Sequence, residues 1–105
     1  MSFKWPPKDK DELLDYSIDW SRFLGAATIG GVIWYVDDSA GVKTAITSGA
    51  VVNGIQNVSQ TISGSVATIN LGLGTANYDY KFTCNMTDSS GSIAERVIRL
   101  KIKEQ

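Results

Sequence analysis

Residues able to do chemistry are few in this chain. It contains no histidine and a single cysteine, Cys84. Histidine is the commonest general base, and zinc and copper centres are built mainly from histidine and cysteine. Cys84 falls on the apolar side of an alternating segment, where a buried structural thiol is expected rather than a nucleophile. We therefore expect no enzyme, no catalytic residue, no metal centre and no cofactor.

Acidic loops are the remaining candidates for a metal site. Asp37 and Asp38 follow one apolar segment, and Asp88 follows another. Their oxygens could gather around Ca²⁺, but they lack the dense succession of oxygen ligands found in a dedicated calcium loop. We interpret them as solvated turns and keep Ca²⁺ as the alternative.

The clearest structural pattern lies in the last third of the chain. Residues 77–87 alternate apolar and polar side chains without a fault, and residues 94–102 alternate again after a turn composition at 88–91. Strict alternation is typical of a strand with one buried face. Two such strands joined by a short glycine-containing loop predict a β-hairpin.

Earlier segments also favour strands. Residues 14–20 alternate, although a helical spacing competes there, and we expect a strand followed by a helical turn over 20–24. Residues 28–36 are rich in β-branched and aromatic types and include Trp34, the expected plug of the core.

The middle of the chain is weaker. We expect short strands near 43–46, 51–58 and 59–62, and a further strand over 65–71. Six to eight short strands without a long helix predict an all-β fold, an immunoglobulin-like antiparallel β-sandwich with an extended N-terminal arm. The predicted core side chains are Tyr16, Trp20, Trp34, Tyr80, Phe82, Cys84 and Leu100.

The chain divides into an arm, residues 1–13, and a sandwich domain, residues 14–105. The arm is polar apart from two aromatic residues, and two prolines hold it extended. A tryptophan beside paired prolines needs somewhere to pack, either on its own domain or on a neighbouring protein. Because aromatic residues are enriched at interface anchors, the candidate partner-binding residues are Phe3, Trp5, Pro6 and Pro7.

Charged residues could also pair across strands. Asp15 and Asp19 lie on the polar side of the first strand, and Arg96 and Arg99 lie in the last. If these strands adjoin, opposite charges would face each other. Exposed pairs contribute about 0.2–1 kcal/mol, so their main effect would be on register.

Overall composition limits the partners. The 105 residues carry 10 basic and 11 acidic side chains. This near-neutral balance argues against nucleic acid and against an anionic membrane surface. No apolar stretch approaches the roughly 20 residues that span a bilayer, and the first residues lack the apolar core of a secretion signal. We expect synthesis in a cytoplasm.

A resemblance to a known family rests on residues 14–21, on Thr28, Ile29 and Trp34, and on the blocks 80–84, 95–96 and 99–100. These resemble small virion proteins of tailed bacteriophages, described as fibre–tail adaptor or head–tail components with an immunoglobulin-like domain. The resemblance implies a structural virion protein that links tail or neck parts to fibres through protein–protein contacts. It also implies several copies arranged with the symmetry of the particle.

Two other functions stay open. A capsid decoration protein belongs to the same structural class. An adhesion module is of a different class and would bind host-surface glycan through loops 37–42, 72–77 and 88–92, near which Tyr78 is the one aromatic residue.

Overall fold

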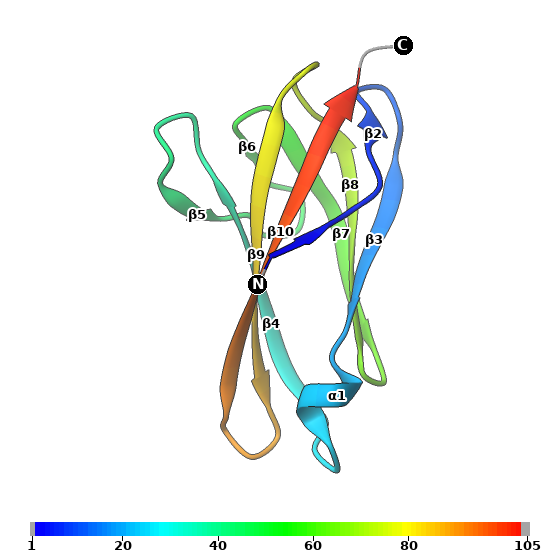
Figure 1. Cartoon of the computed structure of the whole chain (residues 1–105), viewed down its shortest axis with the longest axis vertical. Coiled ribbons are helices and arrows are strands. Elements are labelled where there is room, and N and C mark those ends of the chain that lie inside the picture. The colour runs from blue at the N-terminus through cyan, green and yellow to red at the C-terminus, as the bar shows by residue number, and fades with distance from the viewer. Residues whose placement is uncertain (1, 104–105) are drawn as a thin grey trace.

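The computed structural model describes residues 2–103, and they form two packed β-sheets (Figure 1). One short helix, α1 (Ser21–Leu24), interrupts the strands. The strands are β1 (Ser2–Lys4), β2 (Lys8–Asp9), β3 (Leu14–Asp19), β4 (Ile29–Asp37), β5 (Lys43–Ala45), β6 (Val51–Val52), β7 (Ile55–Ser63), β8 (Val66–Leu73), β9 (Asp79–Asp88) and β10 (Ile93–Lys103). The predicted all-β sandwich is confirmed.

The larger sheet has the order β1-β10-β9-β4-β5. The predicted hairpin forms its centre, with Leu100 of β10 opposite Tyr80 of β9. The long strand β10 also pairs with both arm strands in parallel, with β1 through Val97–Arg99 and with β2 through Ile102 and Lys103. Proline has no main-chain N–H to donate, and Pro6 and Pro7 occupy the gap between β1 and β2.

The smaller sheet has the order β3-β8-β7-β6. β3 runs antiparallel to β8, with Tyr16 opposite Ile69. β7 pairs with the other side of β8, and the register shifts between Asn57 and Ser59. This irregularity is a β-bulge, and it leaves Val58 exposed on the outer side.

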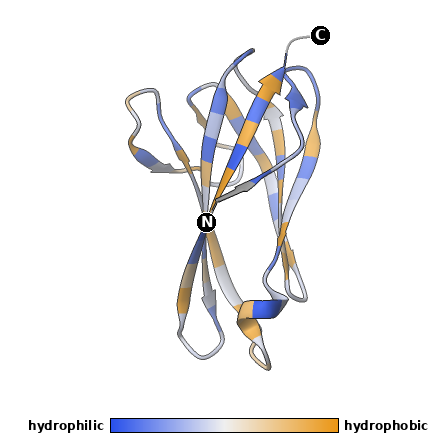
Figure 2. Ribbon diagram, in the orientation of Figure 1, coloured by the Kyte–Doolittle hydropathy of each residue, from blue (hydrophilic) through white to orange (hydrophobic). Residues whose placement is uncertain are grey.

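The core lies between the two sheets. The alternating colours along β9 and β10 in Figure 2 reflect one apolar and one polar face on each strand. All seven side chains predicted for the core are buried, and Trp34 and Tyr80 are each 1% exposed. Residues buried with them from the smaller sheet are Ile18, Ile55, Ala67, Ile69 and Leu71.

The helical turn closes one end of this core. Trp20 precedes α1 and is 1% exposed, and Leu24 at its end is also buried. The guanidinium of Arg96 lies 4.9 Å from the centre of the Trp20 ring, a cation–π distance. Gly25, at φ 57°, then ends the helix in a conformation that L-residues rarely adopt.

The expected strand over 51–58 is wrong as a single element. Asn53 and Gly54, at φ 51° and 82°, form a tight turn that splits the segment into β6 and the start of β7. Two consecutive positive φ values are typical of the type I′ hairpin turn, for which Asn-Gly is the preferred sequence. Residues 59–62 are not a separate strand either, because β7 continues to Ser63. Within residues 2–103 the structure has ten strands, the short arm strands included, where six to eight were expected.

Two contacts agree with the immunoglobulin-like arrangement, which stays a prediction. Trp34 of β4 stands opposite Cys84 of β9, on the inner face. Near the start of β9, the hydroxyl of Tyr80 donates to the Asn53 carbonyl at 2.6 Å and accepts from the Thr75 amide at 2.9 Å. A tyrosine tied to an upstream loop in this way is a feature of such sandwiches. The division of the chain at residue 13 also stays a prediction.

Candidate partner-binding surfaces

The groups that could catalyse a reaction are dispersed or buried. Within residues 2–103, no three histidine, cysteine, aspartate or glutamate side chains gather closely enough to hold a metal ion. Cys84 is free and fully buried, and this burial raises the pKa of its thiol to about 12. The thiol is therefore protonated and inaccessible at neutral pH.

The acidic loops use their carboxylates to fold turns. Oδ1 of Asp38 accepts the amides of Ala40 and Val42, both at 2.9 Å. Oδ1 of Asp88 accepts the amides of Ser90 and Ser92 at 2.9 Å and the Ser90 hydroxyl at 2.7 Å. The Ser90 hydroxyl is the first cause of a lowered pKa at Asp88. These contacts agree with the turn interpretation of both loops.

Trp5 packs on its own domain. Its side chain is 8% exposed and lies among Tyr16, Trp34 and Phe82, with ring centroids 4.8, 5.9 and 5.7 Å away. The indole Nε1 donates to the Ser17 carbonyl at 3.3 Å, and the Trp5 amide donates to the Arg99 carbonyl at 2.9 Å. The ring therefore bridges the open side between β10 and β3.

Lys8 anchors the second half of the arm. Its side chain is fully buried, and Nζ donates to the carbonyls of Leu73 at 2.6 Å and Asp9 at 2.8 Å. Desolvation lowers the pKa of Lys8. Nearby carboxylates raise it by a smaller amount, and Glu12 contributes most among them. No feature of the sequence marked this lysine, because it lies in a run of charged residues typical of a solvated segment.

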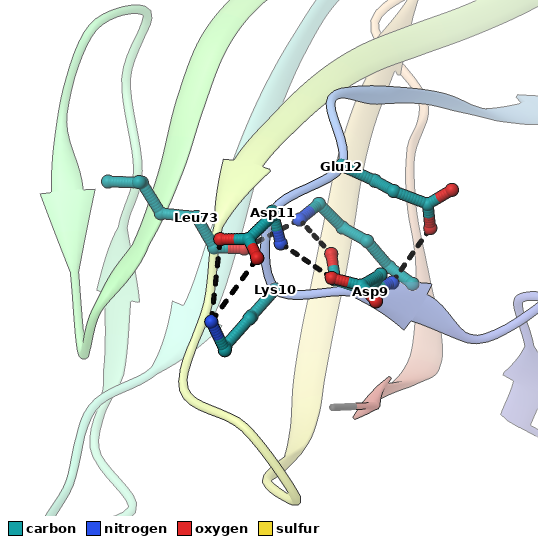
Figure 3. Close-up of polar contacts among 6 residues, drawn as sticks. Asp9, Lys10, Asp11, Glu12 and Leu73 are labelled. Carbon is teal, nitrogen blue, oxygen red and sulfur yellow. Dashed lines mark hydrogen bonds and ion pairs between the residues drawn. The ribbon is translucent and has the colours of Figure 1, made fainter. Parts of the chain in front are cut away.

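A compact turn follows this anchor. Oε1 of Glu12 accepts the Asp9 amide at 2.8 Å, and Oδ1 of Asp9 accepts the Asp11 amide at 2.9 Å (Figure 3). The Glu12 amide donates in turn to the Asp9 carbonyl at 3.0 Å. The charged run 8–12 is thus an ordered connection from β2 to β3.

The predicted partner-binding residues are divided by this arrangement. Pro6 and Pro7 are exposed, whereas Trp5 is buried. The main chain of Phe3 pairs with Ile98, and its side chain lies outside what the structure describes. The partner-binding role of these four residues stays a prediction.

The cross-strand pairing expected between the aspartates of β3 and the arginines of β10 is wrong. It required the two strands to be neighbours, and β3 and β10 belong to different sheets. Asp15 accepts from Nδ2 of Asn70 at 2.6 Å, and Asp19 accepts from the Ser65 hydroxyl at 3.1 Å. Both partners lie on or next to β8, the neighbour of β3. Arg99 is exposed on β10, and Arg96 lies over Trp20.

A groove of about 530 Å³ opens at the edge between the sheets. It is lined by Lys4, Trp5, Ser17, Ile18, Asp19, Arg22, Phe23 and Arg96. These residues come from the arm, β3, α1 and β10, four segments that sequence alone did not bring together. Three basic side chains and one carboxylate line it, so the groove is positively charged.

The outer face of the larger sheet carries a polar cluster. Nζ of Lys43 lies 3.2 Å from Oε2 of Glu95, and it sits 4.8 Å from the centre of the Tyr35 ring. Nδ2 of Asn85 donates to the same Glu95 oxygen at 2.9 Å. These side chains tie β5 to β10 across the intervening strands. Exposed ion pairs of this kind contribute little stability.

Comparison with known families gives one decisive match. Residues 8–101 match the family described as podophage GP4 fiber-tail adaptor protein gp77. The chain belongs to this family. The resemblance found in the sequence is confirmed, and the chain is a structural protein of the phage fibre–tail adaptor type.

The matched region runs from β2 into β10 and so includes both sheets. Residues 2–7, with β1, Trp5 and the paired prolines, precede it. No curated protein matches the chain. No helix among residues 2–103 is long and apolar enough to cross a membrane.

Proposed function

We propose that this protein is a non-enzymatic connector in the virion of a tailed phage, where it links the tail or neck to the fibres by protein–protein contacts. The family match over residues 8–101 carries the proposal. An adaptor must hold two partners at a fixed separation, and a sandwich with a core filled by interlocking aromatic rings is suited to that task.

Several copies on a symmetric particle would strengthen weak individual contacts. Once one copy is docked, its neighbours bind at a raised effective concentration, so modest interfaces are sufficient. The exposed prolines of the arm, Pro6 and Pro7, belong to the proposed contact region. Partner contact through Trp5 would require its ring to leave the core.

The test is reconstitution with purified phage parts. Tails produced without this protein are mixed with fibres, with and without the tagged adaptor, and the complexes are separated by sedimentation. We expect fibres to sediment with tails when the adaptor is added. Sedimentation with capsids instead would identify a decoration protein, and glycan binding by the isolated monomer without attachment to particles would identify an adhesion module.

The arm is tested separately from the fold. Deletion of residues 1–13 removes Trp5 from the core, so a loss of binding could not be distinguished from a loss of stability. A Pro6→Ser, Pro7→Ser double variant keeps Trp5 and changes only exposed positions. Weaker attachment to particles with unchanged unfolding would support the arm as a contact, and unchanged attachment would exclude these prolines.

A further inference from the structure

We propose that the groove between the arm, β3 and α1 binds an extended acidic segment of a partner protein. This inference deepens the proposed adaptor function and rests on it. It supplies the chemistry of one partner contact, namely a strand-like peptide that carries aspartate or glutamate side chains.

The charge of the groove selects the partner. Lys4, Arg22 and Arg96 line it together with one carboxylate, that of Asp19. Asp19 is already engaged, because its Oδ1 accepts the Ser21 amide at 2.9 Å and the Ser65 hydroxyl at 3.1 Å. The Arg96 guanidinium is held over the Trp20 ring at 4.9 Å. Positive charge therefore dominates the groove of a chain that is nearly neutral as a whole.

One wall of the groove is the outer edge of a strand. Among the described residues 2–103, the strand partner of β3 in the smaller sheet is β8 alone. The Trp20 amide donates to the Ser65 carbonyl at 2.8 Å, which continues the β3–β8 ladder by one residue. Along an antiparallel strand, the main-chain N–H and C=O groups of successive residues point alternately toward the partner strand and away from it. Trp20 points toward β8, so Ile18 does as well. The main-chain groups of Ser17 and Asp19 therefore point away from β8, toward the groove.

A separate contact supports this direction. The Ser17 carbonyl accepts the Trp5 indole at 3.3 Å, from the groove side. Because Trp5 already uses the Ser17 carbonyl, an extended peptide would add to this edge through the Ser17 amide and the main chain of Asp19, as in other cases of β-strand addition. Every second side chain of the peptide, the acidic ones, would then contact the basic residues of the groove. The side chains between them would contact Phe23, which is 40% exposed.

The test uses a capped eight-residue peptide that alternates valine and glutamate, titrated into the isotope-labelled full chain and followed by amide and indole chemical shifts. We expect saturable shifts at Ser17, Asp19, Arg22 and the Trp5 indole. A peptide with glutamine in place of glutamate should bind about tenfold more weakly, since it loses the charge-assisted contacts. Equal binding by the glutamine peptide, or by a lysine peptide, would overturn the proposal.

The contribution of the strand edge is tested on the peptide rather than on the protein. Methylation of alternate main-chain nitrogens removes the donors needed for pairing and leaves the fold unchanged. We expect binding to fall at least about tenfold for the register whose amides face β3. Equal affinity for the peptides methylated in either register would overturn the strand-addition geometry.

Arg22→Glu is the groove variant, because this side chain is exposed on α1. Arg99→Glu is its matched control, an exposed arginine on β10 that does not line the groove. We expect about tenfold weaker peptide binding for the first and no change for the second. Equal affinities for the two variants would overturn the proposal.

Reconstitution on tails separates this inference from the proposed function. If Arg22→Glu joins fibres to tails as well as the wild type does, the groove is not the adaptor contact and the adaptor function stands. If wild-type protein binds the acidic peptide but joins no phage parts, the peptide site stands and the adaptor function fails.

Discussion

The indole of Trp5 stacks on the ring of Tyr16, with centroids 4.8 Å apart and planes inclined by 27°. Trp5 follows β1 of the larger sheet, and Tyr16 belongs to β3 of the smaller one. The contact therefore fastens the two sheets together along one open side. It places Trp5 of the N-terminal arm in the core of the sandwich.

Loss of this stack should weaken the whole fold. We expect Trp5→Ala to lower the free energy of unfolding by about 3–5 kcal/mol, the usual effect of removing a large buried aromatic side chain. Urea unfolding followed by far-UV circular dichroism measures the change. Phe23→Ala is the control and should cost less, because Phe23 is 40% exposed. A Trp5 effect no larger than the control would mean that the arm is not docked in solution.

Alkaline pH should loosen the same contact. The Tyr16 hydroxyl donates to the Pro6 carbonyl at 3.2 Å, and burial raises its pKa from 10.0 to about 12. A raised pKa in the folded state means that the stabilisation is complete below pH 10 and is lost as the pH rises through about 12. Tyr16→Phe should cost about 1 kcal/mol at neutral pH and should lose less stability than the wild type between pH 8 and pH 11. Parallel unfolding curves at pH 8 and pH 11 provide the measurement.

Acid should act on the β9–β10 turn. Hydrogen bonds from Ser90 and Ser92 lower the pKa of Asp88 below its ordinary value of 3.8. Because the pKa is lower in the folded state than in the unfolded state, the ionised carboxylate stabilises the fold above pH 3.8. This stabilisation is lost as the pH falls from 3.8 through the lower pKa of the folded state. Asp88→Asn should flatten this part of the stability curve. Thermal unfolding between pH 5 and pH 2 compares this variant with the wild type, and equal slopes for the two proteins would contradict the assignment.

A side chain at Gly54, in the turn between β6 and β7, should destabilise the protein. Gly54 has φ 82°, and a Cβ there would lie 2.7 Å from Oγ1 of Thr75. We expect Gly54→Ala to destabilise the protein by about 1–2 kcal/mol, because the strained backbone and the close contact both oppose it. Gly31→Ala is the matched control, since a Cβ there meets no atom within 4 Å. Denaturant midpoints of the two variants should differ clearly, and coincident midpoints would show that the turn adapts.

The buried ammonium of Lys8 should contribute more to stability than the ammonium of its half-buried neighbour Lys10. Lys8→Met keeps the aliphatic stem and leaves the Leu73 carbonyl without its 2.6 Å donor. We expect a loss of about 1 kcal/mol, because relief of the desolvated charge offsets part of the penalty for an unpaired carbonyl. Lys10→Met breaks only an exposed pair with Asp11 and should be nearly neutral. Calorimetric unfolding temperatures compare the two, and a larger effect at Lys10 would contradict this account.

The sequence by itself determined the fold class and the core of this protein. The alternation in 77–87 and 94–102 and the turn between them are local patterns, and period 2 dictates which side chains share a face. Tyr80, Phe82 and Leu100 are buried as that pattern requires. The sequence blocks that resemble the adaptor family, together with Trp34, indicated this family, and the match over residues 8–101 confirmed it.

Only the tertiary structure decided which edges meet. β3 joined β8 instead of the last strand, so Asp15 and Asp19 found neutral partners. The parallel docking of the arm on β10 and the burial of Lys8 depend on contacts between residues far apart in the chain. No local periodicity encodes such contacts, because strand order and register follow from how the two sheets close over their shared core. The positively charged groove exists only after that closure brings the arm, β3, α1 and β10 together.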